Sequence, residues 1–142
     1  MKWQIYQSLL FLIAISGCGV TNSGTQMQSL LNEARAESRY CGDEYFEGTG
    51  KVQTDSKLQK AANRHSKDMA ESRFFEHEGT DQSRVGERAT DAGYRWRAIA
   101  ENIAHGQTTA AEAVDSWLQS PGHCRNIMNP RYTDFGSANR NS

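Results

Sequence analysis

The chain has 142 residues, a mass of 15.9 kDa and a formal net charge of −1, a length that allows a single domain with its own core. The balanced charge and a pI of about 6.4 exclude the basic surface that nucleic-acid binding requires, so we expect no nucleic-acid partner. A mean hydropathy of −0.76 excludes a protein with several membrane spans, although apolar residues gather near the N-terminus.

That N-terminal region has the layout of a secretory signal. Lys2 precedes the apolar run 9–15, which is too short for a permanent transmembrane helix. The next residues complete the motif Ile15-Ser16-Gly17-Cys18, which resembles the bacterial lipobox, where a peptidase cuts before a cysteine that carries diacylglycerol. We predict a signal peptide over residues 1–17 and lipidation of Cys18. The alternative is an ordinary cleaved signal followed by an incidental cysteine.

The lipobox interpretation predicts where the protein resides and how the chain is divided. Acyl chains on Cys18 would anchor the exported protein to a membrane of the bacterial cell envelope, firmly if two or three chains are attached. Small and polar residues follow Cys18 and indicate a tether. The predicted layout is a signal peptide over 1–17, a lipidated tether over 18–26 and a folded domain over 27–142.

The remaining cysteines form an even pair. If Cys18 is lipidated, Cys41 and Cys124 are left in a chain interpreted as exported, and such pairs favour a disulfide. The alternative is that Cys124, which follows His123, acts as a nucleophile.

Apolar spacing predicts three helices in the first part of the domain. A stripe that includes Leu30 and Leu31 indicates a helix over 26–39, and a Gly-rich, acidic loop is expected over 41–50. A second helix, capped by Asp55 or Ser56, is expected to run to about Ser72. A short third helix over 83–92 should stop at a glycine.

The second part of the domain mixes strands and a helix. Residues 97–104 alternate, with Glu101 between two isoleucines on one side, which is the periodicity of a strand. Thr109 and Glu112 form a capping box that opens a helix, and Pro121 with Gly122 is expected to end it. A second strand is predicted over 134–138, and the mixture indicates an α+β layered domain.

Four histidines are candidates for chemistry. We expect His65 to pack in the core and His105 to be solvated, whereas His77 and His123 follow segments that can present them at a cleft. The chain has no His-Glu-x-x-His or Gly-x-Ser-x-Gly motif. A site built from His77, Glu101 and His123 is possible, but sequence spacing alone does not establish that they converge.

Five segments in order resemble the CAP superfamily (cysteine-rich secretory proteins, antigen 5 and pathogenesis-related proteins), especially its bacterial SCP-like members. They are Leu30-Leu31-Asn32-Glu33-Ala34-Arg35, the segment 61–70, Phe74-Phe75-Glu76-His77, Ala100-Glu101-Asn102-Ile103-Ala104 and the segment 117–130, which begins Trp117-Leu118-Gln119-Ser120-Pro121-Gly122-His123-Cys124. The resemblance covers about residues 28–138. It implies an α-β-α sandwich with a central antiparallel sheet.

The resemblance also implies a cleft with two histidines and two acidic residues. His77 and His123 match the two histidines, which in some members bind zinc or another divalent cation, and Glu101 matches one acidic residue. The second acidic position falls near Ser120, where no carboxylate stands. A further strand is expected after Phe135-Gly136, so the domain is predicted to be short at its C-terminal strand.

These observations predict a lipid-anchored, non-catalytic module of the cell envelope that binds a lipid, a cell-wall component or a protein. The alternative is a metal-assisted hydrolase of the peptidase or esterase type, in which His77 and His123 hold the metal and Glu101 is the catalytic base. A third possibility is a structural surface protein with a vestigial cleft.

Overall fold

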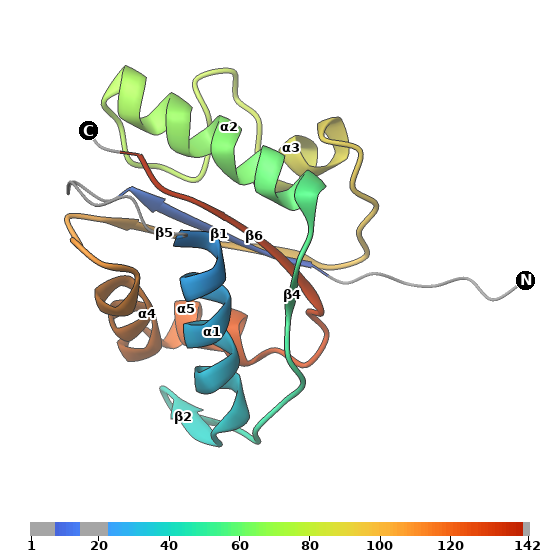
Figure 1. Ribbon diagram of the computed structural model, residues 1–142, viewed down its shortest axis with the longest axis vertical. Helices are drawn as coiled ribbons and strands as arrows, with labels where there is room; N and C mark the ends of the chain where they lie inside the picture. The colour runs from blue at the N-terminus through green and yellow to red at the C-terminus, as the bar shows by residue number, and fades with distance from the viewer. Residues whose placement is uncertain (1–7, 15–22, 141–142) are drawn as a thin grey trace, which may run out of the picture.

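The protein is described here by a computed structural model that places residues 8–14 and 23–140. The helices are α1 (Ser23–Ala36), α2 (Ser56–Ser72), α3 (Val85–Asp91), α4 (Ala110–Gln119) and α5 (Pro121–Met128). The strands are β1 (Ser8–Ala14), β2 (Arg39–Cys41), β3 (Glu44–Phe46), β4 (Gln53–Thr54), β5 (Ile99–His105) and β6 (Asp134–Ala138). One sheet lies between α2 and α3 on one face and α1, α4 and α5 on the other, which confirms the three-layered fold (Figure 1).

The direction of the strands differs from the expectation. The larger sheet has the order β4-β6-β1-β5, and each of its pairs is parallel rather than antiparallel. Helices connect the successive strands of this sheet, and a helical crossover returns the chain so that the next strand points the same way. Only β2 and β3 pair in antiparallel fashion within the described part of the chain, in a separate small sheet.

Strand β1 comes from the segment predicted to be a signal peptide. Ser8–Ala14 lies between β5 and β6 and pairs with both. The lipobox cysteine, Cys18, lies outside the described residues, so its lipidation stays a prediction. Helix α1 begins at Ser23, inside the segment predicted to be a tether.

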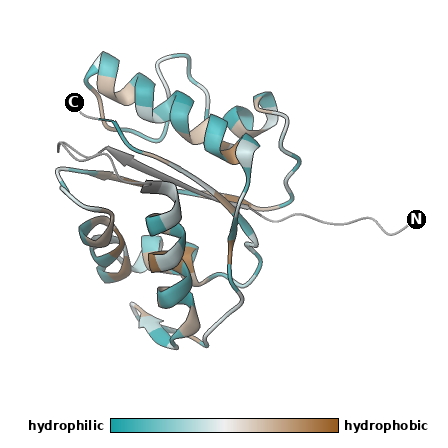
Figure 2. Cartoon of the chain, in the orientation of Figure 1, coloured by the Kyte–Doolittle hydropathy of each residue, from teal (hydrophilic) through white to brown (hydrophobic). Residues whose placement is uncertain are grey.

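The two faces of the sheet carry separate hydrophobic clusters. The cluster under α1, α4 and α5 includes Trp117, Ile127 and Phe135, all nearly inaccessible to solvent. The cluster under α2 and α3 includes Leu58 and Met69, while the outward side of α2 is largely hydrophilic (Figure 2). This division is the pattern of an amphipathic helix on a sheet, in which burial of one apolar stripe stabilises the layer.

Several predicted elements match the structure closely. Asp55 is the N-cap of α2, and its carboxylate accepts hydrogen bonds from the main-chain amides of Lys57 (2.8 Å) and Leu58 (3.1 Å). The predicted capping box of Thr109 and Glu112 opens α4. Strand β6 has the predicted bounds.

Two predictions about local structure were wrong. The segment 41–50 is not all loop, because Glu44–Phe46 pairs with Arg39–Cys41 in a hairpin. Pro121 does not simply end a helix; it stands in the first turn of α5, where the missing amide of proline costs nothing. Ser120, in extended conformation, separates α4 from α5.

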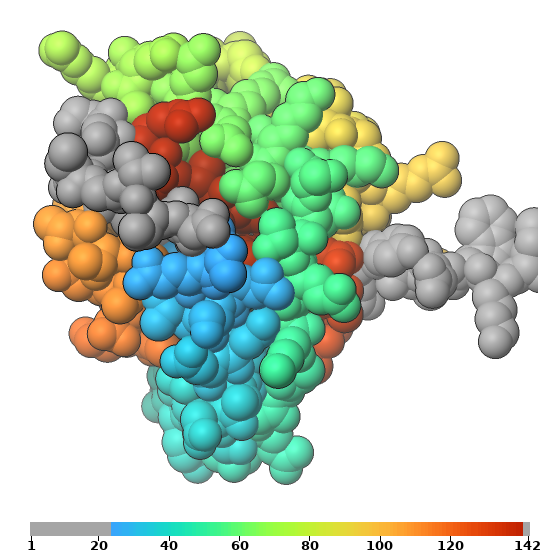
Figure 3. All heavy atoms as spheres, viewed as in Figure 1, coloured from blue at the N-terminus to red at the C-terminus, as the bar shows by residue number. Residues whose placement is uncertain are grey.

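Helix α1 fixes the course of the chain that follows the hairpin. The side-chain amide of Asn32 donates to the carbonyl of Val52 (3.1 Å), and its oxygen accepts from the amide of the same residue (2.8 Å). The side chains of α1 and the segment around β4 are packed side by side on the surface (Figure 3). Asn32 thereby satisfies both main-chain groups of Val52, the residue that precedes β4.

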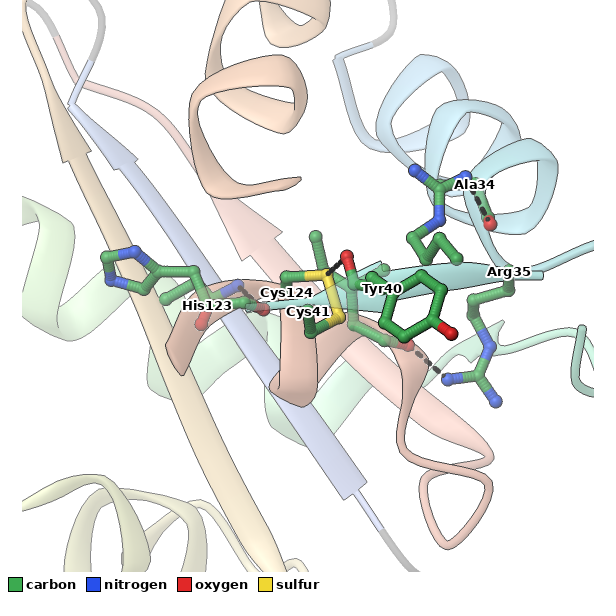
Figure 4. The surroundings of a disulfide bond; sticks show 9 residues. Ala34, Arg35, Tyr40, Cys41, His123 and Cys124 are labelled. Atoms are coloured by element: carbon green, nitrogen blue, oxygen red, sulfur yellow. Dashed lines mark hydrogen bonds between the residues drawn. A yellow bond between two sulfur atoms is a disulfide. The ribbon is translucent and has the colours of Figure 1, made fainter. Parts of the chain in front are cut away.

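The predicted disulfide between Cys41 and Cys124 is present. It links β2 to α5 across 83 residues, with the two Cα atoms 5.4 Å apart (Figure 4). A sulfur atom in a disulfide is not a nucleophile, so the alternative role of Cys124 is excluded in this state.

We expect the double variant Cys41→Ser with Cys124→Ser to lose about 4 kcal/mol of unfolding free energy, because the bond restricts a long loop in the unfolded chain. Urea unfolding of both proteins under oxidising conditions measures the difference. Wild-type protein in excess reductant is the control and should approach the double variant. Equal midpoints for oxidised wild type and variant would contradict the prediction.

Candidate functional site

Strand β5 places Glu101 toward the α2 and α3 layer. Ile103, on the same side of the strand, joins the cluster under α2, whereas Asn102 points to the other face and donates to the carbonyl of His123 (3.1 Å). The side chain of Glu101 is only 2% exposed. A buried carboxylate requires partners of opposite charge or hydrogen-bond donors, because desolvation otherwise disfavours its charged form.

Arg88 of α3 is the first partner of Glu101. Its Nη2 donates to Glu101 Oε2 at 2.7 Å, and its side chain is 1% exposed. The same guanidinium donates to the main-chain carbonyls of His77 (3.1 Å) and Ser83. Arg88 therefore neutralises the buried carboxylate and ties the loop that carries His77 to α3.

His77 is the second partner of Glu101. Its Nδ1 lies 2.8 Å from Glu101 Oε1, and 58% of its side chain is exposed. The hydrogen bond with Glu101 is the main cause that raises the pKa of His77 above its usual value. Since Nδ1 faces the carboxylate, the exposed part of the ring presents Nε2 to a ligand.

His65 of α2 lies behind this pair. It is buried, as expected, and its Nε2 lies 2.9 Å from the carbonyl oxygen of Glu76 and 4.0 Å from Glu101 Oε1. Burial lowers the pKa of His65, so the neutral ring is favoured. A neutral ring with its proton on Nε2 donates to the carbonyl of Glu76 and holds the chain that leads to His77.

His123 approaches the site from the opposite helical layer. It belongs to α5, and its imidazole points away from the disulfide formed by the next residue (Figure 4). Burial lowers the pKa of His123, and the positive charge of His77 lowers it further. Because β5 is the edge strand of its sheet, side chains from both layers can interact around that edge. The structure thus brings His77 and Glu101 into contact and His123 into electrostatic interaction with His77.

The opposite pKa shifts of His77 and His123 can be measured by NMR titration of the imidazole Cε1 protons. We expect His77 to titrate above the usual value of about 6.5 and His123 below it. The raised pKa of His77 means that its stabilising effect is complete below the unfolded pKa and is lost as the pH rises through the folded pKa. Glu101→Gln should lower the midpoint of His77, since it removes the charge. A midpoint of His77 below that of His123 in the wild type would contradict the assignment.

The profile of the cysteine-rich secretory protein family, CAP, matches residues 28–139. The chain belongs to the CAP family. A crystal structure of an extracellular protein containing a SCP domain from Bacillus anthracis superimposes with a TM-score of 0.71 at 23% identity, over 84% of this chain and 40% of that one. This similarity confirms the CAP-type fold.

Two relatives come from Bacillus subtilis. The uncharacterised protein YkwD is 34% identical over 90 residues, which is 63% of this chain and 35% of YkwD. The uncharacterised membrane protein YlbC is 28% identical over 116 residues, which is 82% of this chain and 31% of YlbC. The chain therefore spans about a third of the length of these relatives.

The candidate site offers two imidazoles, those of His77 and His123, as metal ligands. Catalytic zinc centres use three protein ligands and leave one position for water. Within residues 24–140, whose side chains the structure describes, no group of three or more His, Cys, Asp or Glu is placed to hold a metal ion. Both oxygens of Glu101 are engaged by Arg88 and His77, and Ser120 stands where the family resemblance implied a second acid.

The sequence did not reveal the part that Arg88 plays. The sequence pattern indicates this role only indirectly. A glutamate between two isoleucines of a strand is expected to be buried and therefore to need a cation as its partner. Several arginines were available, and only the packing of α3 against β5 selects Arg88. The predicted solvation of His105 is confirmed, although its ring also lies 5.7 Å from that of the exposed Phe75, measured between ring centroids.

Proposed function

We propose that this CAP domain is an exported, lipid-anchored binding module of the bacterial cell envelope and that it is not an enzyme. The exposed imidazole of His77 and the nearby His123 contact the ligand, which is a lipid, a cell-wall component or a protein, and the buried Glu101 orients His77. The observation that carries the proposal is the engagement of Glu101. With Oε2 on Arg88 and Oε1 on His77, this buried carboxylate acts as an orienting group rather than a free base.

Two further observations support export and anchoring. The Cys41–Cys124 disulfide suits an oxidising compartment outside the cytoplasm. The chain is also similar to a protein called extracellular and to another called a membrane protein. No helix in the described ranges, 8–14 and 23–140, is long and apolar enough to cross a membrane. The proposed anchor is the diacylglycerol on Cys18.

The anchor is tested by fractionation of cells that express wild type or Cys18→Ser. Wild type should be processed and sediment with membranes, whereas the variant should not. Cys41→Ser is a control that removes a different cysteine and keeps the lipobox. A processed Cys18→Ser protein that stays with the membranes would refute lipidation.

The alternative function is a metal-assisted hydrolase. The observation that favours it is the histidine–carboxylate pair of His77 and Glu101, since a carboxylate commonly orients a metal-binding imidazole. His77 Nε2 and His123 would then hold a divalent cation such as zinc, and the cation would activate a water. In the binding module the same two imidazoles are able to hold a cation that only helps to bind the ligand.

Zinc titration followed by hydrolysis assays separates these functions. The purified protein is compared with the His77→Ala and His123→Ala double variant, and His105→Ala is the control because it removes an exposed histidine outside the predicted site. Equal zinc uptake by wild type and double variant would exclude the metal site. Zinc-dependent hydrolysis of envelope-derived peptides or esters that the double variant lacks would overturn the non-catalytic proposal.

A further inference from the structure

Strand β1 is held along both of its edges. Each residue of Ser8–Ala14 lies opposite a residue of β5, from Ile99 to His105, and Ser8 to Leu12 lie opposite β6. At the position of Leu10 the two partners are Glu101 of the candidate site and Gly136. The segment therefore completes the sheet beside the candidate site.

Strands β5 and β6 need a strand between them to pair the main-chain groups on their facing edges. They are not neighbours in the sheet, because β1 lies between them. Two strands separated by a third are about 9.6 Å apart, which is too far for direct N–H···O hydrogen bonds. Without an occupant, the facing edges of β5 and β6 would leave main-chain donors and acceptors unpaired in the middle of the molecule.

The composition of the segment suits this position. Leu9 to Ile13 form an uninterrupted apolar run, which is typical of a parallel strand covered on both faces. Helix α2 covers one face of the sheet and packs on β1, and α1, α4 and α5 lie over the other. The occupant that this space requires is thus an extended apolar peptide parallel to β5.

We propose that the space between β5 and β6 is a strand-acceptor site for an extended apolar peptide and that Ser8–Ala14 is its occupant within the unprocessed chain. The same residues lie inside the predicted signal peptide, so a cut before Cys18 removes the connection that keeps the strand in place. Folding of the domain and cleavage of the signal peptide therefore compete for Ser8–Ala14. After cleavage, the domain binds this strand as a separate peptide. The consequence for processing rests on the proposed export, whereas the acceptor site does not.

The test uses the full chain with a site-specific protease sequence inserted between Ser16 and Gly17. After the folded protein is cut, we expect the N-terminal fragment to co-elute with the domain in size-exclusion chromatography. An excess of a fluorescent peptide of residues 7–15 should then replace the fragment, as followed by anisotropy. The control peptide carries Leu10→Pro and Leu12→Pro, which remove main-chain donors of the strand, and it should exchange at least tenfold less.

Immediate release of the fragment from a domain that keeps its circular dichroism and thermal midpoint would overturn the proposal. Equal exchange of the two peptides would also overturn it, because binding would then not depend on strand pairing. Release accompanied by loss of the folded signal would support it, since the sheet would then need its occupant. Fractionation of the Cys18→Ser variant tests the lipid anchor separately, so failure of the anchor leaves this result unaffected.

Discussion

Replacement of Arg35 by methionine is expected to lower the free energy of unfolding by about 4 kcal/mol. Arg35 is a fully buried side chain of α1, and its guanidinium donates to four main-chain carbonyls. The acceptors are Gly50 (2.6 Å), Ile127 (2.6 Å), Asn129 (3.1 Å) and Tyr132 (2.9 Å). Methionine fills a similar volume but leaves these carbonyls without their donor in the interior.

The size of this effect follows from what Arg35 connects. Its hydrogen bonds join α1 to the loop before β4 and to the end of α5 with the chain that follows it, so one side chain holds three segments together. Burial lowers its pKa only to about 10, and the group stays charged at neutral pH. The carbonyl dipoles around it therefore compensate a full positive charge.

Denaturant unfolding followed by tryptophan fluorescence measures the loss. Arg39→Met is the matched control, because Arg39 is only partly buried and donates to one carbonyl, that of Ala34 (2.8 Å). We expect the control to lose about 1 kcal/mol. Similar losses for the two variants would show that the four acceptors of Arg35 do not matter.

Substitution of Gly136 by alanine is expected to cost about 3 kcal/mol, at the upper end for a small-to-large change. A Cβ atom at Gly136 would overlap the carbonyl carbon of Leu58 and the amide nitrogen of Gln59. Both are main-chain atoms of α2, so no side-chain rotation relieves the overlap. The helix would have to move off the sheet.

Thermal unfolding followed by circular dichroism provides the measurement for Gly136→Ala. Gly122→Ala makes the same chemical change in α5, where a Cβ meets nothing within 4 Å, and it should be neutral or slightly stabilising. Because α2 also carries His65, displacement of α2 should disturb the cluster around Glu101. A midpoint equal to that of the wild type would mean that α2 adjusts without cost.

Local patterns predicted the helices and strands that carry the site. The Asp55 cap and the Thr109 capping box depend on contacts within a few residues, and both appear as expected. The alternation around Glu101 placed it correctly on the same side as the isoleucines. The hairpin of β2 and β3 was missed because its strands have three residues each, too few for a clear period.

The partners of Glu101 could not be predicted from the sequence. His77, Glu101 and His123 were named as a possible site from the residues and then matched by the family resemblance, but spacing alone did not establish that they converge. Their geometry depends on the packing of α3 and α5 against an edge strand. The contact between Arg88 and Glu101 supports the orienting role of Glu101 over the role of base that the alternative hydrolase hypothesis gave it.

The sequence by itself determined the near-neutral net charge, the cysteine pair of the disulfide and most of the helices and strands. These properties depend on composition or on residues close together in the chain. The tertiary structure alone decided the parallel order of the sheet, the four acceptors of Arg35, the closeness of Gly136 to α2 and the partners of Glu101. Each of these depends on atoms from distant segments, whose meeting is set by close packing of the whole domain rather than by any local pattern.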